Sequence, residues 1–335
     1  MGSKSRQLHI FFFPLMAHGH LIPTMDMAKL FAERGVKATI VTTPRNMPIF
    51  SKTRGTNVDI QIIKFPAVEA GLPEGCENVD SVTSEDMSDK FIKATKMLQQ
   101  PLEQLLEEYQ PSCLVADMFF PWATDVAANL GIPRLAFSVT SFFSLSSQHS
   151  LQLYEPHKKV FSDSEPFVIP SFPGEIKLTR MELPDFYLQE VETDFYKLLK
   201  EAIESEFTSY GVVVNSFYEL EPAYADHYRK VLGIKAWHIG PVSLCNKDAE
   251  DKAQRGKEAS IDEQECLNVG AQQWTRVVDG IKSEAIERAM RQILVGEEAA
   301  RAKALGEMAR RAVEEGGSSY SDLNALIEEL RLYCL

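Results

Sequence analysis

Nucleotide-binding glycine motifs are missing from the start of this chain. The segment after a predicted strand at 8–13 contains neither G-x-G-x-x-G nor G-x-x-x-x-G-K-[ST], which disfavours dinucleotide and P-loop chemistry there. Positive charge is also scarce, because 35 basic residues face 48 acidic ones and the formal net charge is −13. This balance argues against a surface that binds nucleic acid.

Paired cysteines and long apolar runs are lacking as well. The five cysteines are widely spaced and form no C-x-x-C pair: Cys76, Cys113, Cys245, Cys266 and Cys334. We therefore expect reduced thiols in a cytoplasmic protein. No apolar stretch is long enough to cross a bilayer and no secretory hydrophobic segment precedes the first strand, so we expect no membrane span.

The composition is that of a chain with a large core. With 335 residues, 44% of them hydrophobic, it can form two domains or one large domain with additions. Apolar runs that alternate with helical segments predict strands at 8–13, 37–43, 58–65, 113–116, 134–137, 211–215 and 236–239. This alternation is typical of βαβ units, a mostly parallel sheet and a Rossmann-like α/β domain.

The last third of the chain differs in composition. We expect the Rossmann-like domain to occupy 1–245, a polar linker 246–267 and a helical segment 268–335. Apolar faces in this segment predict helices at 283–294, 299–315 and 320–332. Helices without strands cannot form a second α/β domain, so they must pack on the first domain or on a partner.

Two histidines, His18 and His20, lie between the first strand and the helix that follows it. Ligands bind at the carboxyl ends of the strands in an open parallel sheet, and a neutral imidazole there can accept a proton. The alternative is that each is a structural histidine of the loop.

A carboxylate, Asp117, ends the predicted strand at 113–116. A buried carboxylate needs a partner, and the loop with His18 and His20 opens on the same edge of the sheet. Such a pair fixes the tautomer of the imidazole and leaves its other nitrogen free to deprotonate a hydroxyl. Because no G-x-S-x-G elbow is present, that hydroxyl would belong to a substrate. The alternative is that Asp117 is an acid at a helix N-terminus.

Several segments together resemble the plant family of UDP-dependent glycosyltransferases that act on small lipophilic acceptors. These segments are FPLMAHGHLIP (13–23), LVADMFFPWATDVAANLGIPRLAF (114–137), TSFFS (140–144), VVVNSFYELEPAYADHYRK (212–230) and WHIGPVSLC (237–245). The resemblance covers nearly all of 7–267. It implies a GT-B fold, inversion at the anomeric carbon, no metal and no cofactor. The donor substrate would be a UDP-sugar such as UDP-glucose, and the acceptor a flavonoid, another phenolic or a triterpenoid.

The resemblance also implies roles for single residues. His20 would be the general base and Asp117 its orienting partner, while Thr140 resembles a threonine that approaches the donor sugar. His18 would line the acceptor pocket. Further acceptor contacts are expected from Met16, Phe119, Phe120 and Phe142. The alternative for each of the three phenylalanines is that it belongs to the core.

The donor-binding signature of the family is not found in this sequence. That signature begins with a W-A-P-Q-like run, continues through an H-C-G-W-N-S-like run and ends with an acidic residue followed by Gln. The segment 268–274 instead resembles a region beyond it, and 297–330 resembles the C-terminal helices. We therefore predict an internal deletion near Leu267 and Asn268, with the helices retained to cover the first domain.

The missing signature predicts that a UDP-sugar is bound weakly if at all, and that transfer is slow or absent, because positioning of the reactants contributes several kcal/mol. Two other functions stay open. One is a small-molecule binding module without catalysis. The other is an unrelated Rossmann-like nucleotide-binding protein, against which the missing glycine loop and the pairing of HGHLIP with Asp117 both count.

Overall fold

The computed structural model describes residues 7–51, 57–188, 192–247 and 297–334. Seven parallel strands form the central sheet in the order β3-β2-β1-β4-β5-β8-β9. Their bounds are β1 (His9–Phe13), β2 (Lys37–Thr42), β3 (Val58–Ile62), β4 (Cys113–Asp117), β5 (Arg134–Ser138), β8 (Gly211–Val214) and β9 (Ala236–His238). The predicted parallel α/β fold is confirmed.

The strand order reverses between β1 and β4. From β1 the chain builds outward to β3 on one side, and it then returns to β4 and continues to β9 on the other side. Crevices at such a reversal, outside the carboxyl ends of the strands, are where open α/β sheets bind ligands. The topology thus brings the start of the helix after β1 next to the end of β4.

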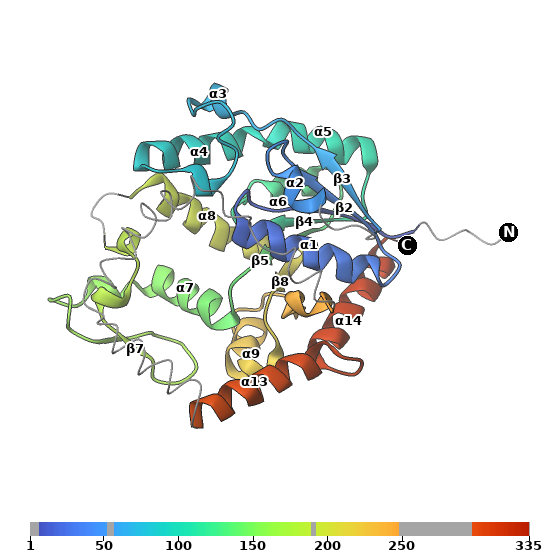
Figure 1. Ribbon diagram of the computed structural model, residues 1–335. Coiled ribbons are helices and arrows are strands. Elements are labelled where there is room, and N and C mark those ends of the chain that lie inside the picture. The colour runs from blue at the N-terminus through green and yellow to red at the C-terminus, as the bar shows by residue number, and fades with distance from the viewer. Residues whose placement is uncertain (1–6, 52–56, 189–191, 248–296, 335) are drawn as a thin grey trace.

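Helices cover both faces of the sheet (Figure 1). In chain order they are α1 (His18–Ala32), α2 (Met47–Ser51), α3 (Ala67–Ala70), α4 (Glu85–Met97), α5 (Gln99–Tyr109), α6 (Ala123–Asn129), α7 (Phe142–Tyr154), α8 (Asp194–Thr208), α9 (Pro222–Lys230), α13 (Glu297–Val313) and α14 (Ser318–Tyr333). One core cluster joins the sheet to α1 and α14, and a second joins its opposite face to α4, α5 and α6.

Successive side chains of β1 point alternately into the two core clusters. Ile10 and Phe12 belong to the cluster under α1, while Phe11 and Phe13 belong to the cluster under α4 to α6. All four side chains are fully buried. A strand covered on both faces is continuously apolar, which explains why the run of phenylalanines predicted it correctly.

The C-terminal helix packs back on the first domain, as predicted. Leu323, Leu326, Ile327 and Leu330 of α14 are at most 3% exposed and share the core cluster of α1 and β9. In Figure 1, α13 and α14 form the red arm that runs past α9 and along the edge of the sheet. The helices at 299–315 and 320–332 are confirmed by α13 and α14.

Some of the predictions for the last third cannot be compared with the structure. The predicted linker beyond Lys247, the deletion point at Leu267 and Asn268, Cys266 and the helix at 283–294 lie outside the described residues.

One local expectation was wrong. His18 and His20 lie in the first turn of α1 rather than in a loop, because the Ala17 carbonyl already accepts the first helical hydrogen bonds from the amides of His20 and Leu21. Between α7 and α8, the chain also forms a small antiparallel pair that the sequence analysis did not predict, β6 (Phe167–Val168) with β7 (Lys177–Leu178).

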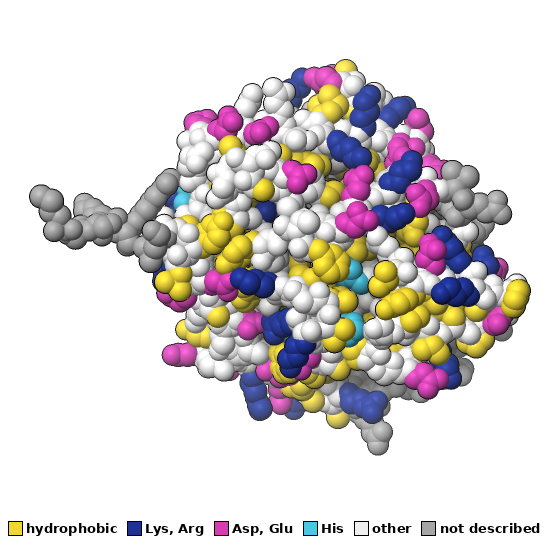
Figure 2. All heavy atoms as spheres, turned by 180° about the vertical axis from the view of Figure 1, so that it is seen from behind, with side chains coloured by type: hydrophobic (Ala, Val, Ile, Leu, Met, Phe, Trp, Pro, Cys, Tyr) yellow, Lys and Arg dark blue, Asp and Glu magenta, His cyan; other side chains and the backbone are white. Residues whose placement is uncertain are grey.

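The surface carries charges of both signs. On the face seen in Figure 2, acidic and basic side chains are interspersed with apolar ones. Within the described part of the chain, no helix combines the length and the apolar character needed to cross a bilayer.

Candidate active site

His20 and Asp117 meet where the strand order reverses. Nδ1 of His20, in the first turn of α1, lies 2.6 Å from Oδ2 of Asp117, the last residue of β4. The Asp117 side chain is fully buried, and the His20 side chain is 16% exposed. The structure therefore brings together the two residues to which the sequence analysis gave the acid–base chemistry.

The hydrogen bond orients the imidazole for proton transfer. An ionised carboxylate only accepts hydrogen bonds, so Nδ1 of His20 donates to Asp117. No other described residue bonds to Nε2, which is left as the nitrogen that can take a proton. Burial lowers the pKa of His20, but the charge of Asp117 and the hydrogen bond outweigh that effect, so the pKa of His20 is raised above 6.5.

A buried arginine supports the segment that carries Asp117. The guanidinium of Arg134, on the neighbouring strand β5, donates at 3.0 Å to the Asp117 carbonyl and at 2.7 Å to the Ser209 hydroxyl. The Phe119 amide donates to Oδ1 of Asp117 at 3.1 Å. Burial lowers the pKa of Arg134 to about 10. Our sequence analysis missed Arg134, although a basic residue at the start of a buried strand was a usable signal.

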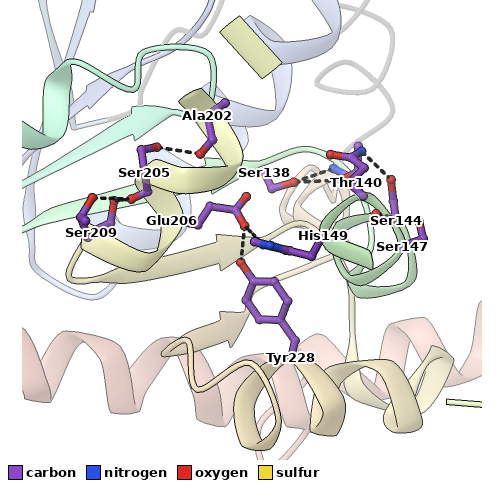
Figure 3. A network of polar contacts seen from close by, with 12 residues as sticks. Ser138, Thr140, Ser144, Ser147, His149, Ala202, Ser205, Glu206, Ser209 and Tyr228 are labelled. Atoms are coloured by element: carbon purple, nitrogen blue, oxygen red, sulfur yellow. Dashed lines mark hydrogen bonds and ion pairs between the residues drawn. The ribbon is translucent and has the colours of Figure 1, made fainter. Parts of the chain in front are cut away.

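Thr140 lies just beyond the end of β5, on the same edge of the sheet. Its hydroxyl is 2.9 Å from that of Ser138, and its side chain is partly exposed. Figure 3 shows both residues at the start of α7. This position is compatible with a contact to a sugar, and the role itself stays a prediction.

Two of the residues expected to contact an acceptor are open to solvent. Phe119 is partly exposed and its ring centroid lies 5.8 Å from that of His20. His18 is partly exposed, and its Nδ1 is bonded to the carboxylate of Asp80. Asp80 was also missed, because nothing in the loop sequence distinguishes it from neighbouring acidic residues.

The other three residues expected to contact an acceptor lie in the core of the protein. Met16, Phe120 and Phe142 have no exposed surface. Phe120 stacks on Phe13 at a centroid distance of 4.4 Å, and Phe142 packs against Tyr228 at 5.2 Å. Apolar side chains at these positions fill the core, so the core alternative holds for both phenylalanines.

Another histidine–carboxylate pair lies inside the protein, beneath α7. Oε2 of Glu206, on α8, accepts hydrogen bonds from Nε2 of His149 at 2.9 Å and from the Tyr228 hydroxyl at 2.6 Å (Figure 3). His149 is 8% exposed and Glu206 is 1% exposed. Burial and the carboxylate raise the pKa of Tyr228 well above its usual value. This network holds three helices together.

Metal ligands do not gather anywhere in the described residues. No group of three or more His, Cys, Asp or Glu side chains there has an arrangement that could hold a metal ion. The four cysteines in the described part of the chain, Cys76, Cys113, Cys245 and Cys334, are free thiols.

Comparison with known proteins places this arrangement in a family, although no model of a protein family matches the chain. The chain is 40% identical to the scopoletin glucosyltransferase of Nicotiana tabacum over 469 alignment positions that cover 98% of both proteins. It is 57% identical over 271 residues to the UDP-glucose flavonoid 3-O-glucosyltransferase 7 of Fragaria ananassa, covering 80% of this chain and 55% of that protein.

A solved structure agrees. The fold matches a UDP-glycosyltransferase of Glycyrrhiza uralensis, crystallised with glycyrrhetinic acid 3-O-monoglucuronide, with a TM-score of 0.82 and 28% identity. The alignment covers 98% of this chain and 96% of that one.

The lengths of the relatives bear on the predicted deletion. Seven other curated relatives, the Fragaria ananassa enzyme among them, are matched over only about half of their own length, 55–57%. In the tobacco alignment a chain of 335 residues spans 469 positions, which requires a long gap and is consistent with an internal deletion. The identity and coverage of that alignment establish the family: this chain belongs to the plant UDP-glycosyltransferases, in a shortened form.

Proposed function

We propose that this chain is the acceptor-binding part of a UDP-glycosyltransferase, with His20 as the general base and Asp117 as its orienting partner. The observation that carries the proposal is the 2.6 Å contact between Nδ1 of His20 and Oδ2 of Asp117 at the reversal of strand order. The names of the relatives, which include glucosyltransferases of scopoletin, a flavonoid and an anthocyanin, support a phenolic acceptor and glucose as the sugar.

The proposed reaction uses one proton transfer and one displacement. Nε2 of His20 takes the proton of an acceptor hydroxyl while the oxygen attacks the anomeric carbon of the sugar. The bond from that carbon to the diphosphate breaks, and UDP leaves with the electron pair. Attack opposite the leaving group inverts the anomeric carbon. Asp117 stabilises the imidazolium that forms on His20.

In the proposal, each of the three parts of the chain has a separate role. Residues 1–245 form the domain that binds the acceptor, residues 246–267 form a linker, and residues 268–335 form a helical segment that covers the acceptor domain. Because the donor signature is missing, the UDP-sugar is held weakly and transfer is slow or absent. We place the protein in the cytoplasm, which agrees with the free thiols.

A second function, acceptor binding without catalysis, is favoured by the length of the chain. It spans about half of most of the relatives named above, and holding both reactants in line is a large part of transferase catalysis. The two functions share the acceptor site and differ only in whether a sugar is moved.

A transfer assay separates them. The purified chain is incubated with UDP-glucose and a pool of phenolic and triterpenoid acceptors, and the products are weighed by mass spectrometry. We expect acceptor binding by calorimetry and little or no glycoside. A glycoside formed at a rate comparable to that of a full-length relative, and lost in His20→Ala, would show that a donor site survives here. Absence of acceptor binding in folded protein would contradict both functions.

A further inference from the structure

A second imidazole–carboxylate pair stands at the start of α1 beside the first. Nδ1 of His18 is bonded to Oδ2 of Asp80, which lies in a short 3₁₀ turn, η1 (Val79–Ser81). The two side chains are 25% and 40% exposed. Because an ionised carboxylate accepts the Nδ1 proton, Nε2 of His18 is left with a lone pair that can accept a hydrogen bond.

The turn that carries Asp80 is anchored by other contacts. The Val79 amide donates to the Met16 carbonyl at 2.8 Å. Nδ2 of Asn78 donates to Oδ1 of Asn46 at 2.8 Å, and Nδ2 of Asn46 donates to the Glu77 carbonyl at 2.9 Å. These bonds fix the turn to the loops after β1 and β2. The imidazole–carboxylate pair is therefore not needed to hold it.

The openness of this pair sets it apart from the pairs that serve packing. His149 and Glu206 are enclosed, and His238, which is bonded to Asp322, has no exposed surface. His18 and His20 both stand at the carboxyl edge of the sheet, where it binds ligands. A polar pair that is open there, and not required for the fold, is available to a ligand.

We propose that the His18–Asp80 pair binds a second hydroxyl of the acceptor, remote from the hydroxyl that His20 deprotonates. That hydroxyl donates a hydrogen bond to Nε2 of His18, and Asp80 is the positioning residue that fixes the tautomer of His18. This inference rests on the proposed function of the site. It adds a preference for acceptors with two separated hydroxyl groups.

The helix geometry explains why the second hydroxyl is remote. Residues two apart in an α-helix have Cα atoms about 5.4 Å apart and side chains that diverge, so they do not face each other. His20 turns to Asp117 on the sheet, and His18 turns to Asp80 on the loop. Since the two imidazoles turn to different elements, we expect hydroxyls on different rings, rather than on adjacent carbons, to reach both of them.

Three flavones that differ only in hydroxylation test the inference. We would measure the binding of 7-hydroxyflavone, 4′,7-dihydroxyflavone and 7,8-dihydroxyflavone to the full chain by calorimetry. We expect the 4′,7-compound to bind about five- to tenfold more tightly than the other two, which is what one additional hydrogen bond contributes. Equal binding of all three would overturn the inference and leave the proposed function standing.

Matched variants assign the preference to the pair. His18→Phe keeps a ring but loses the acceptor nitrogen, and Asp80→Ala frees the tautomer, so both should reduce the preference to within about twofold. Asp86→Asn alters an exposed carboxylate that pairs with Lys90 on the same helix, α4, and it should keep the full preference. A preference that survives in His18→Phe would overturn the inference.

A thermal unfolding curve of each variant serves as the control that the variant is folded. Should His18→Phe unfold, His18→Leu takes its place; a leucine side chain cannot accept a hydrogen bond, and the preference should again fall. Failure of the wild-type chain to bind any of the three flavones would overturn the proposed acceptor site, and this inference with it.

Discussion

The same two groups, an imidazole and a carboxylate, are used in two ways in this molecule. Beneath α7, His149 and Glu206 are almost fully enclosed, and the Tyr228 hydroxyl bonds to the same carboxylate oxygen. At the start of α1, His20 is bonded to Asp117 through one nitrogen while its other nitrogen stays open. The two pairs consist of the same chemical groups, and their surroundings decide whether a pair serves packing or is available for the proposed proton transfer.

The difference is one of access, because the His149–Glu206 pair is enclosed while the His20 side chain is 16% exposed. In the buried network, Oε2 of Glu206 accepts hydrogen bonds from side chains on two other helices. Removal of one of these three side chains leaves its partner without that hydrogen bond in a medium of low dielectric constant. At the proposed active-site pair, one nitrogen of His20 has no partner among the described residues, and the cost of burying Asp117 is offset by His20, the Phe119 amide and the charge of Arg134. This contrast makes opposite predictions for the two regions.

Glu206→Ala should have the largest effect on stability. It leaves His149 and Tyr228 buried without their partner, and we expect the free energy of unfolding to fall by about 3–5 kcal/mol in urea titrations. Glu206→Gln, which keeps an accepting oxygen, should lose less. If Glu206→Ala costs less than about 1 kcal/mol, the network does not hold the helices and the contrast with the active site fails.

Leu326→Ala should come next. The side chain has no exposed surface and joins α14 to the core of the sheet, so its loss leaves a cavity that costs about 2–4 kcal/mol. Leu332→Ala on the same helix is the control, because that side chain is 70% exposed and its loss should cost below about 0.5 kcal/mol. Equal effects of the two changes in chemical unfolding would show that α14 is not part of the core that covers the sheet.

Asp322→Ala should destabilise by about 1–2 kcal/mol. Oδ2 of Asp322 on α14 accepts bonds from Arg229 at 2.6 Å and from the His238 amide at 2.9 Å. Burial raises the pKa of Asp322, but bonds from His238 and Arg229 outweigh this, and the net direction is downward. A lowered pKa means stability that is present above the unfolded-state pKa and lost as the pH falls through the folded-state pKa. The difference from wild type should therefore shrink in acid, and a difference that grows there would contradict this assignment.

At neutral to alkaline pH, Asp117→Asn should have the smallest effect of these changes on the free energy of unfolding, less than about 1 kcal/mol. Its main effect should be on the pKa of His20. With Asp117 the pKa of His20 is raised above 6.5; without the charge, burial alone acts and should bring it below 6.5. The check is a titration of the His20 ring by nuclear magnetic resonance. An unchanged midpoint would contradict the assigned pair.

The pH dependence of the same variant has a definite sign. Because the folded-state pKa of His20 is raised, the charged pair stabilises wild type fully below the unfolded-state pKa of about 6.5, and this stability is lost as the pH rises through the folded-state pKa. Chemical unfolding at pH 5.5 and pH 8.5 should show a larger deficit of Asp117→Asn at the lower pH. The reverse order would exclude the proposed pairing.

Much of the fold followed from local patterns. Apolar runs and helical periods placed the seven strands of the sheet, and Ser84 caps α4 with a bond from the Met87 amide, as its position before the acidic turn indicates. Pro101 lies near the start of α5, which Leu98 separates from α4. Such features depend on neighbours in the chain. The hairpin of β6 and β7 was missed because strands of two residues leave no periodicity to recognise.

The sequence by itself determined the α/β class and the meeting of a histidine, His18 or His20, with Asp117, while the choice of His20 and the return of the C-terminal helices followed from the family resemblance. Parallel strands put their carboxyl ends on one edge, so a histidine after one strand and a carboxylate ending another must share it. Only the tertiary structure decided that Asp80 takes His18, that Arg134 supports Asp117, and that Met16, Phe120 and Phe142 belong to the core. His18 and Asp80 are 62 residues apart, and the choice of one partner among several acidic residues depends on how the loops pack. Local sequence carries no record of that packing.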